Sequence, residues 1–133
     1  VMLMSPLTVA MRNAGLSTQL GNLALEVHFF AMFAPGFVSG RIIGAAGPAR
    51  TALLGVALFA GAAATLASGQ DLGHFVGGMA LVGVSWNLCF SAGTVMLASC
   101  YSAEDAPRVQ GANDFVIFFT AGGGSTASGF VYS

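Results

Sequence analysis

The stretch HFFAMFAPGFVSGRIIGAAGPAR, from His28 to Arg50, decides the fold that we expect for this chain. It begins as an apolar run around Pro35 and continues with small residues at every fourth position, Gly36, Gly40 and Gly44. Residues four apart share one face of a helix, and glycines there let a second helix pack backbone to backbone. The pattern predicts a membrane hairpin, in which one apolar helix, a short basic turn and a second apolar helix follow one another.

The composition places the whole chain in a lipid bilayer. Of the 133 residues, 56% are hydrophobic and 7% are charged, whereas a soluble domain carries about 25% charged residues. The mean hydropathy is +0.81. The 19 glycines suit helices that close packing holds together in lipid. We therefore expect an all-α, polytopic, multi-pass integral membrane protein. It has no basic patch for a nucleic acid.

Apolar segments divide the chain into one expected transmembrane domain over 1–133. We predict a partial helix over 1–11 and then membrane-spanning helices over 23–43, 51–68, 72–99 and 109–132. A bilayer requires about 20 apolar residues per helix. Asp71 is the expected N-cap of the 72–99 helix. A half-helix at the start and no loop after the last helix indicate a piece of a longer protein.

The few cations predict the orientation. With loops taken in alternation, Arg41, Arg50 and Arg108 fall on one side of the membrane and Arg12 on the other. Cytoplasmic loops carry the excess of arginine and lysine. We therefore expect the Arg41–Arg50 turn in the cytoplasm, in a protein of the plasma (inner) membrane.

The loop GRIIGAAGPAR, residues 40–50, resembles the short cytoplasmic loop of the major facilitator superfamily (MFS). Gly40, Gly47 and Arg50 match the pattern of that loop. Gly44 stands where the family has an aspartate. Three further stretches look like bacterial-type members of the superfamily: HFFAMFAPGF (28–37), GVSWNLCF (83–90) and RVQGANDF (108–115).

The resemblance implies a partial MFS-type helix bundle, from the end of helix seven through helix eleven of twelve. It further implies secondary active transport of a small solute by alternating access. Either a proton gradient or the solute's own gradient would drive this transport. The remaining half of the transporter would be a partner of this chain, because the solute site lies between two halves.

Polar residues in the 72–99 segment are candidates for the solute path. Asn87, Ser91 and Thr94 are spaced i, i+4 and i+7 and so form one stripe on an apolar helix. The stripe either faces a water-filled path or forms hydrogen bonds between helices, which such residues also do in lipid. Trp86 lies mid-segment, where it either packs or lines a cavity.

Ionisable residues are candidates for coupling or gating. Histidine as a residue type can titrate near neutral pH, so His28 could couple transport to protons, or it could lie at the membrane interface. Asp114 either complements the helix dipole or forms an inner-gate contact with a basic loop. Arg41 and Arg50 are the basic gating candidates, and Arg41 alternatively reaches out to the headgroups.

Two further features complete the predicted sites. Ser125 and Gly129 continue a close-packing face in the last segment. The spacing of Glu26, His28 and His74 matches no metal-ligand pattern, and no nucleophile and base form a catalytic set. We expect no enzyme, cofactor or metal.

The alternative to a transporter is a small multispanning membrane protein that packs against a partner and transports nothing itself.

Overall fold

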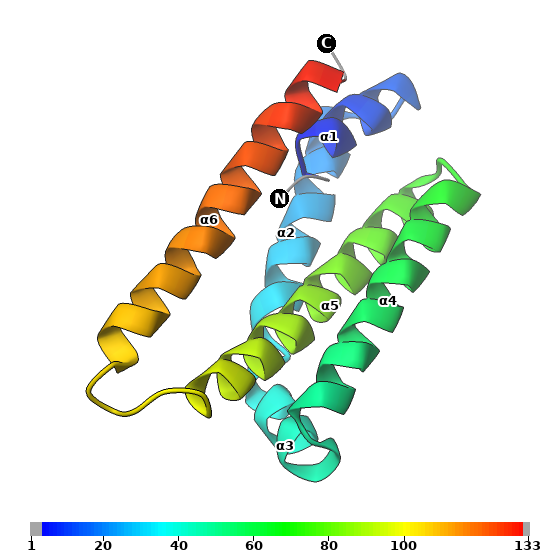
Figure 1. Cartoon of the computed structure of the whole chain (residues 1–133). Helices are drawn as coiled ribbons and strands as arrows, with labels where there is room; N and C mark the ends of the chain where they lie inside the picture. The colour runs from blue at the N-terminus through cyan, green and yellow to red at the C-terminus, as the bar shows by residue number, and fades with distance from the viewer. Residues whose placement is uncertain (1–3, 132–133) are drawn as a thin grey trace.

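The computed structural model describes residues 4–131, except for the side chains of 4–6, 8, 125 and 128–131. This part of the chain consists of helices joined by turns and contains no strand, which confirms the all-α prediction. The described residues form, in chain order, the helices α1 (Met4–Asn13), α2 (Thr18–Phe33), α3 (Gly36–Ala46), α4 (Pro48–Ser68), α5 (Leu72–Ala98) and α6 (Ala106–Val131) (Figure 1).

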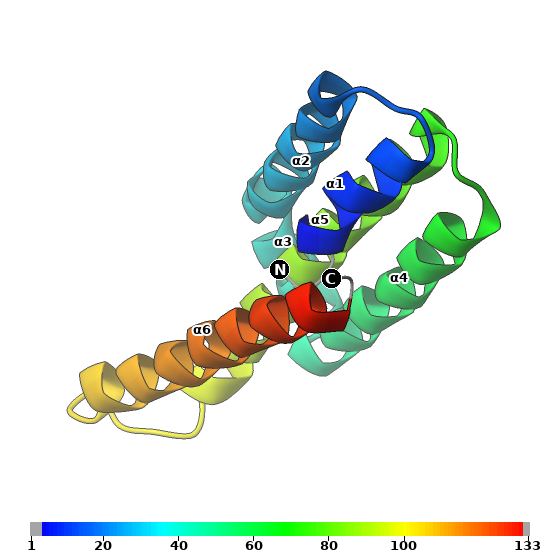
Figure 2. The ribbon, with the colours of Figure 1, turned by 90° about the horizontal axis from the view of Figure 1, so that it is seen from above.

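Helix α5 is the centre of the arrangement. It packs along α4 on one side and along α2 on the other, while α1 lies across the start of α2. Seen from above, α6 diverges from the other helices and meets them near α1 (Figure 2). Most of its described side chains are exposed. The α2–α5 and α4–α5 contacts therefore hold the described helices together.

A bend at Pro35 divides the helix expected over 23–43 into α2 and α3. The two helices meet at 45°. Proline has no N–H and its ring clashes with the preceding turn, so the ladder of helical hydrogen bonds cannot continue through it. The carbonyl of Ala31, four residues before Pro35, consequently has no helical N–H to accept from. The prediction of one continuous helix here is wrong.

The turn between α3 and α4 consists of one residue, Gly47. Its φ of 84° and ψ of 155° lie in a region that only glycine adopts readily. Pro48 starts α4, where a missing N–H costs nothing, and Thr51 Oγ1 donates to Gly47 O over 2.9 Å. Arg41 thus lies inside α3 and Arg50 in the first turn of α4, both exposed.

Replacing Gly47 with alanine is expected to destabilise the protein by about 1–3 kcal/mol, because a Cβ makes this backbone conformation strained. A Cβ would meet no other atom within 4 Å, so the loss comes from the backbone alone. Thermal unfolding in detergent would measure it. Gly61→Ala, in open space on α4, is the control. Equal melting of both variants would contradict this account of the turn.

The length and composition of the helices fit a bilayer. In the described residues, α4 and α5 are each long and apolar enough to span it, and the bent pair α2 and α3 together could form a third span. Large side chains face outward along these helices. For example, Phe30, Phe33 and Phe37 are 74%, 66% and 89% exposed. Apolar surface of this kind is stable against lipid and unstable in water.

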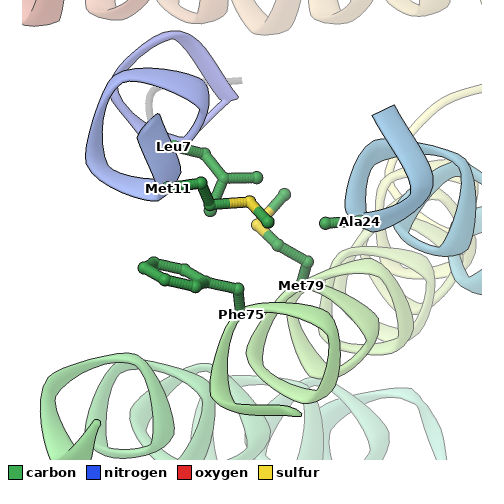
Figure 3. Close-up of a cluster of buried hydrophobic side chains, with 5 residues drawn as sticks. All are labelled: Leu7, Met11, Ala24, Phe75 and Met79. Atoms are coloured by element: carbon green, nitrogen blue, oxygen red, sulfur yellow. The ribbon is translucent and has the colours of Figure 1, made fainter. Parts of the chain in front are cut away.

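A cluster of buried side chains joins the first helices to α5. Leu7 and Met11 of α1 meet Ala24 of α2 and Phe75 and Met79 of α5 (Figure 3). Met11 and Met79 are almost completely buried. Methionine is flexible and fills the irregular space where three helices cross. This cluster fixes the first half of α5 against α2, directly before the polar residues of both helices.

Asp71 caps α5, as the sequence predicts. Its Oδ1 accepts a hydrogen bond of 3.0 Å from the backbone N–H of His74, and His74 Nδ1 lies 2.8 Å from the same oxygen. The backbone bond, followed by the contact with the His74 side chain, lowers the pKa of the Asp71 carboxyl below its ordinary value. The ionised carboxylate is thus the form that stabilises the start of α5.

This cap predicts a dependence of stability on pH. Because the folded-state pKa is lowered, the contribution of Asp71 is complete above its ordinary pKa and is lost as the pH falls through the lowered value. The melting temperature of the wild type should therefore fall more steeply than that of Asp71→Asn between about pH 5 and about pH 2. Asparagine keeps the accepting oxygen without titrating. Parallel curves for the two proteins would contradict the prediction.

Candidate functional site: the polar junction of α2 and α5

Gly83 lies where α2 and α5 cross at very close range. A Cβ at this position would lie 2.6 Å from His28 O, 2.8 Å from Ala31 Cβ and 3.0 Å from the Ala31 carbonyl carbon. Real Cβ atoms essentially never approach so closely, so only glycine allows this crossing. The sequence of α5 places Gly83 one helical turn before Asn87. Residues around the crossing are therefore brought within hydrogen-bonding distance of the other helix.

Two hydrogen bonds join the helices on either side of this crossing. His28 Nδ1, on α2, lies 3.0 Å from Met79 O on α5. Because a carbonyl can only accept, Nδ1 carries the proton of this bond. In the opposite direction, Asn87 Nδ2 on α5 donates to Met32 O on α2 over 2.7 Å. Each helix thus supplies one side chain and one carbonyl.

Both side chains are buried, His28 at 3% exposure and Asn87 at 7%. The bond to Met32 O requires Nδ2 rather than Oδ1 on that side, so it determines which way the Asn87 amide faces. Asn87 Oδ1 is then left buried without a hydrogen-bond partner among the described residues. A buried acceptor in this state costs about 1–3 kcal/mol.

The bend between α2 and α3 lies beside the Asn87 amide, on its Nδ2 side. A Cβ on Gly36, the first residue of α3, would be 3.9 Å from Asn87 Nδ2. In this described segment, no backbone hydrogen bond runs from Gly36 or Phe37 back to α2. Free N–H groups therefore lie at the start of α3, and the Ala31 carbonyl lies at the end of α2. Backbone polar groups inside a membrane are left free in this way only where they line a cavity or contact protein.

Comparison with curated proteins decides the family. A riboflavin transporter of Brucella anthropi is 36% identical over 117 residues, which cover 88% of this chain and 29% of that protein. Two uncharacterised MFS-type transporters of Bacillus subtilis are each 27% identical over 133 residues, covering 98% of this chain and 30% of the transporter. The chain belongs to the major facilitator superfamily. It spans less than a third of the length of these relatives.

The relatives agree with the superfamily resemblance seen in the sequence, and they are transporters of the membrane. No family model matches the chain, and no solved structure matches it. The chain is therefore part of an integral membrane protein whose relatives transport solutes. The names of the relatives do not locate a solute site in this chain.

Of the polar stripe predicted for this MFS chain, Asn87, Ser91 and Thr94, only Asn87 forms a described hydrogen bond at the junction of α2 and α5. Asn87 bonds across to α2, whereas Thr94 Oγ1 donates to Phe90 O of its own helix over 2.9 Å. Ser91 is half-buried. Trp86 stacks on Phe90, with ring centroids 4.7 Å apart. In the described structure, Asn87 and His28 are the predicted path residues that form hydrogen bonds across the α2–α5 crossing, each to a backbone carbonyl of the other helix.

The gating candidates lie away from the junction. Arg41, Arg50 and Asp114 are all exposed, and the Asp114 carboxylate accepts a bond of 3.4 Å from its neighbour Asn113. Within the described chain, none of these three forms an ion pair. Their role as an inner gate stays a prediction, since a partner for them would have to come from other parts of an MFS transporter.

The glycines that the sequence predicts for helix packing are not the glycines at which the described helices come close together. A Cβ on Gly40 or Gly44 would meet nothing within 4 Å, and a Cβ on Gly36 would meet only Asn87. The surroundings of Ser125 and Gly129 lie outside the described side chains. Among the described glycines inside helices, close approach to another helix occurs instead at Gly55, Gly78 and Gly83. Their spacing is irregular, so a search for glycines at every fourth position misses them.

A pocket of about 290 Å³ lies at the other end of α2. Residues of α1 and of the start of α2 line it, among them Met11, Arg12 and Thr18. None of the predicted path residues contributes to its lining. The polar junction, rather than this pocket, is the candidate site because it holds buried polar side chains inside apolar helices.

Proposed function

We propose that this chain forms part of the second half of a secondary transporter, which moves a small solute by alternating access. The buried polar junction of α2 and α5 carries the proposal. Ionisable and polar groups inside membrane helices are rare and mark solute or ion routes. The other half of the transporter would complete the path, because solute sites in such folds lie between repeats.

Riboflavin is the first solute to test, because the Brucella anthropi relative is named as a riboflavin transporter. In this proposal Asn87 contacts the solute, Trp86 lies directly before it in the same helix, and Ser91 and Thr94 lie farther along that helix toward the cytoplasm. His28 takes part in proton coupling. Its Nδ1 is already committed to Met79 O, so protons would exchange at Nε2.

The proposed orientation places the turn at Gly47 in the cytoplasm and the protein in the plasma (inner) membrane. Arg41 and Arg50 lie on either side of this turn and are exposed, as the excess of cations on cytoplasmic loops requires. Asp114, near the start of α6, would lie on the same side. A carboxylate there could pair with a basic loop in the inward-closed state.

Transport into proteoliposomes tests the proposal. The complete reading frame that contains this chain would be reconstituted, and uptake of riboflavin and a panel of other small solutes measured together with internal pH. We expect uptake by the wild type and a loss of about tenfold or more in Asn87→Ala, because the variant removes a buried polar group on the path. Asn22→Ala, at an exposed position of α2, is the matched control.

His28→Ala separates coupling from binding. If His28 couples protons, this variant should still exchange solute down its gradient but should no longer move protons with it. Uptake that survives both Asn87→Ala and His28→Ala would contradict the site and leave the transporter assignment standing. Failure of every solute to enter would contradict transport itself and would favour a protein that only packs against a partner.

A further inference from the structure

We propose that the hydrogen bond from Asn87 to Met32 O is a latch on the bend between α2 and α3. Asn87 Nδ2 and the backbone N–H of Gly36 compete for this one carbonyl. While Asn87 holds it, the span is bent. When Asn87 releases it, Gly36 takes it and α3 swings toward the line of α2. The proposal rests on the proposed function for its use in transport, whereas the bend itself can be measured without a solute.

Met32 O is the shared acceptor. In a continuous helix, the carbonyl of residue 32 accepts from the N–H of residue 36. Here it accepts from Asn87 Nδ2 over 2.7 Å, and the Gly36 N–H donates to no carbonyl of α2 within the described residues. A Cβ on Gly36 would lie 3.9 Å from the same Nδ2. Because a carbonyl drawn toward α5 cannot also align with its own helix axis, it accepts from one donor at a time.

The backbone at the bend needs little change to straighten. Ala34, with φ −57° and ψ −41°, is helical, and so is Pro35, with φ −66° and ψ −13°. A regular α-helix has ψ near −42°, so a rotation of about 30° at Pro35 separates the two forms. Proline removes one N–H from the ladder, and membrane helices tolerate this loss. The bond from Asn87 is therefore a second cause of the 45° bend.

Unpaired polar groups show that the bent form is not strongly favoured. Asn87 Oδ1 is buried without a hydrogen-bond partner among the described residues, and in the same part of the chain neither Gly36 nor Phe37 donates back to α2. The straight form pairs these N–H groups but gives up the bond from Asn87. Each form thus leaves some polar groups unpaired, which is costly in lipid. Two arrangements of similar free energy are what a hinge requires.

Helix α3 can move as a short rigid piece. It joins the end of α2 to the start of α4 (Figure 1). The close crossing at Gly83 holds α2 against α5, whereas only Ser39 and Ile43 of the 11 residues of α3 are buried. The far end of α3 is Gly47, whose φ of 84° forms the turn into α4. The helix therefore lies between two joints, and the latch sets its tilt.

A distance between two spin labels measures the bend. The complete protein would carry labels at Gln19→Cys and Ala45→Cys, which are exposed positions of α2 and α3, with its other cysteines replaced by alanine. From the helical rise per residue, opening the 45° bend fully would lengthen this distance by about 3 Å. We expect Asn87→Leu and Asn87→Ala each to lengthen it by about 2–3 Å while Pro35 is still present.

Two further variants define the cause. Pro35→Ala restores the missing N–H and should lengthen the same distance by about 3 Å. In that background Asn87→Leu should add nothing, because Met32 O is already taken by the backbone. Thr94→Val is the matched control on α5, since the Thr94 hydroxyl bonds to Phe90 O of its own helix. It should keep the wild-type distance. Elution as a single species in size exclusion identifies the folded variants.

The outcomes separate the latch from the proposed function. If folded Asn87 variants keep the wild-type distance while Pro35→Ala lengthens it, proline alone sets the bend and the latch is wrong. If Pro35→Ala also keeps that distance, packing holds α3 in place and the latch is wrong as well. Uptake that is lost in Asn87→Ala with an unchanged bend leaves the transport site without the latch. Longer distances in the Asn87 variants, with no solute uptake by the wild type, leave the latch and overturn transport.

Discussion

Gly83→Val is expected to destabilise the protein by about 2–4 kcal/mol and to separate α2 from α5. The Cβ of valine would lie 2.6 Å from His28 O and 3.0 Å from the Ala31 carbonyl carbon. Both are backbone atoms, which cannot rotate away as a side chain can. Overpacking of this kind costs about 1–3 kcal/mol, and the two hydrogen bonds between the helices would be lost as well, at about 0.6 kcal/mol each.

Thermal unfolding of the complete protein in detergent would measure this loss. Gly93→Val is the matched control, because Gly93 lies on the same helix and a Cβ there meets nothing within 4 Å. Away from the crossing, valine is a better helix former than glycine, so the control should melt at the wild-type temperature or higher. If Gly83→Val and Gly93→Val melted together, the close crossing of α2 and α5 would be wrong.

The second large effect is expected at Gly55, where α4 packs on α5. A Cβ there would lie 2.5 Å from Cys89 Sγ, 3.1 Å from Ser85 O and 3.2 Å from Cys89 N. Gly55→Val should therefore destabilise the protein by about 1–3 kcal/mol. Gly61→Val, on the same helix in open space, controls for the substitution itself. Melting temperatures of the two variants in detergent give the comparison.

A double variant separates the two causes of this effect. The shortest contact of Gly55 is with a side chain, so Cys89→Ala should relieve much of the strain in Gly55→Ala, where only one methyl group is added. The two backbone contacts remain, so the same change should rescue Gly55→Val poorly. Strictly additive losses in the Gly55→Ala, Cys89→Ala double variant would show that the thiol does not limit the approach.

The apolar composition of the chain was enough to predict membrane-embedded helices. Polar turns bound the apolar runs, and the cap at Asp71 could be read from one acidic residue before a helix. The bend at Pro35 was harder to predict, because proline can also lie within a continuous, gently bent membrane helix. Which of these a chain adopts depends on what packs against it. Here α5 lies against α2, and Asn87 takes the carbonyl of Met32 that a continuous helix would use.

For the candidate site, the sequence identified His28 and Asn87 separately, each as a rare polar residue in an apolar segment. Neither spacing nor helical periodicity relates them, because they are on different helices. The pairing with Met79 O and Met32 O involves backbone carbonyls, which every residue has and which therefore leave no signal in the sequence. The irregular glycines that permit close approach were missed for a similar reason.

What the sequence by itself determined is the environment: with 7% charged residues, this chain can bury its apolar surface only in lipid, and its backbone must be helical there. The tertiary structure alone decided which glycines lie at helix crossings and which backbone carbonyls the polar side chains reach across them. Local propensity and hydropathy depend on neighbours along the chain. Contact between α2 and α5 depends on the shapes of two surfaces far apart in sequence, and only their packing brings Asn87 beside the free end of α3.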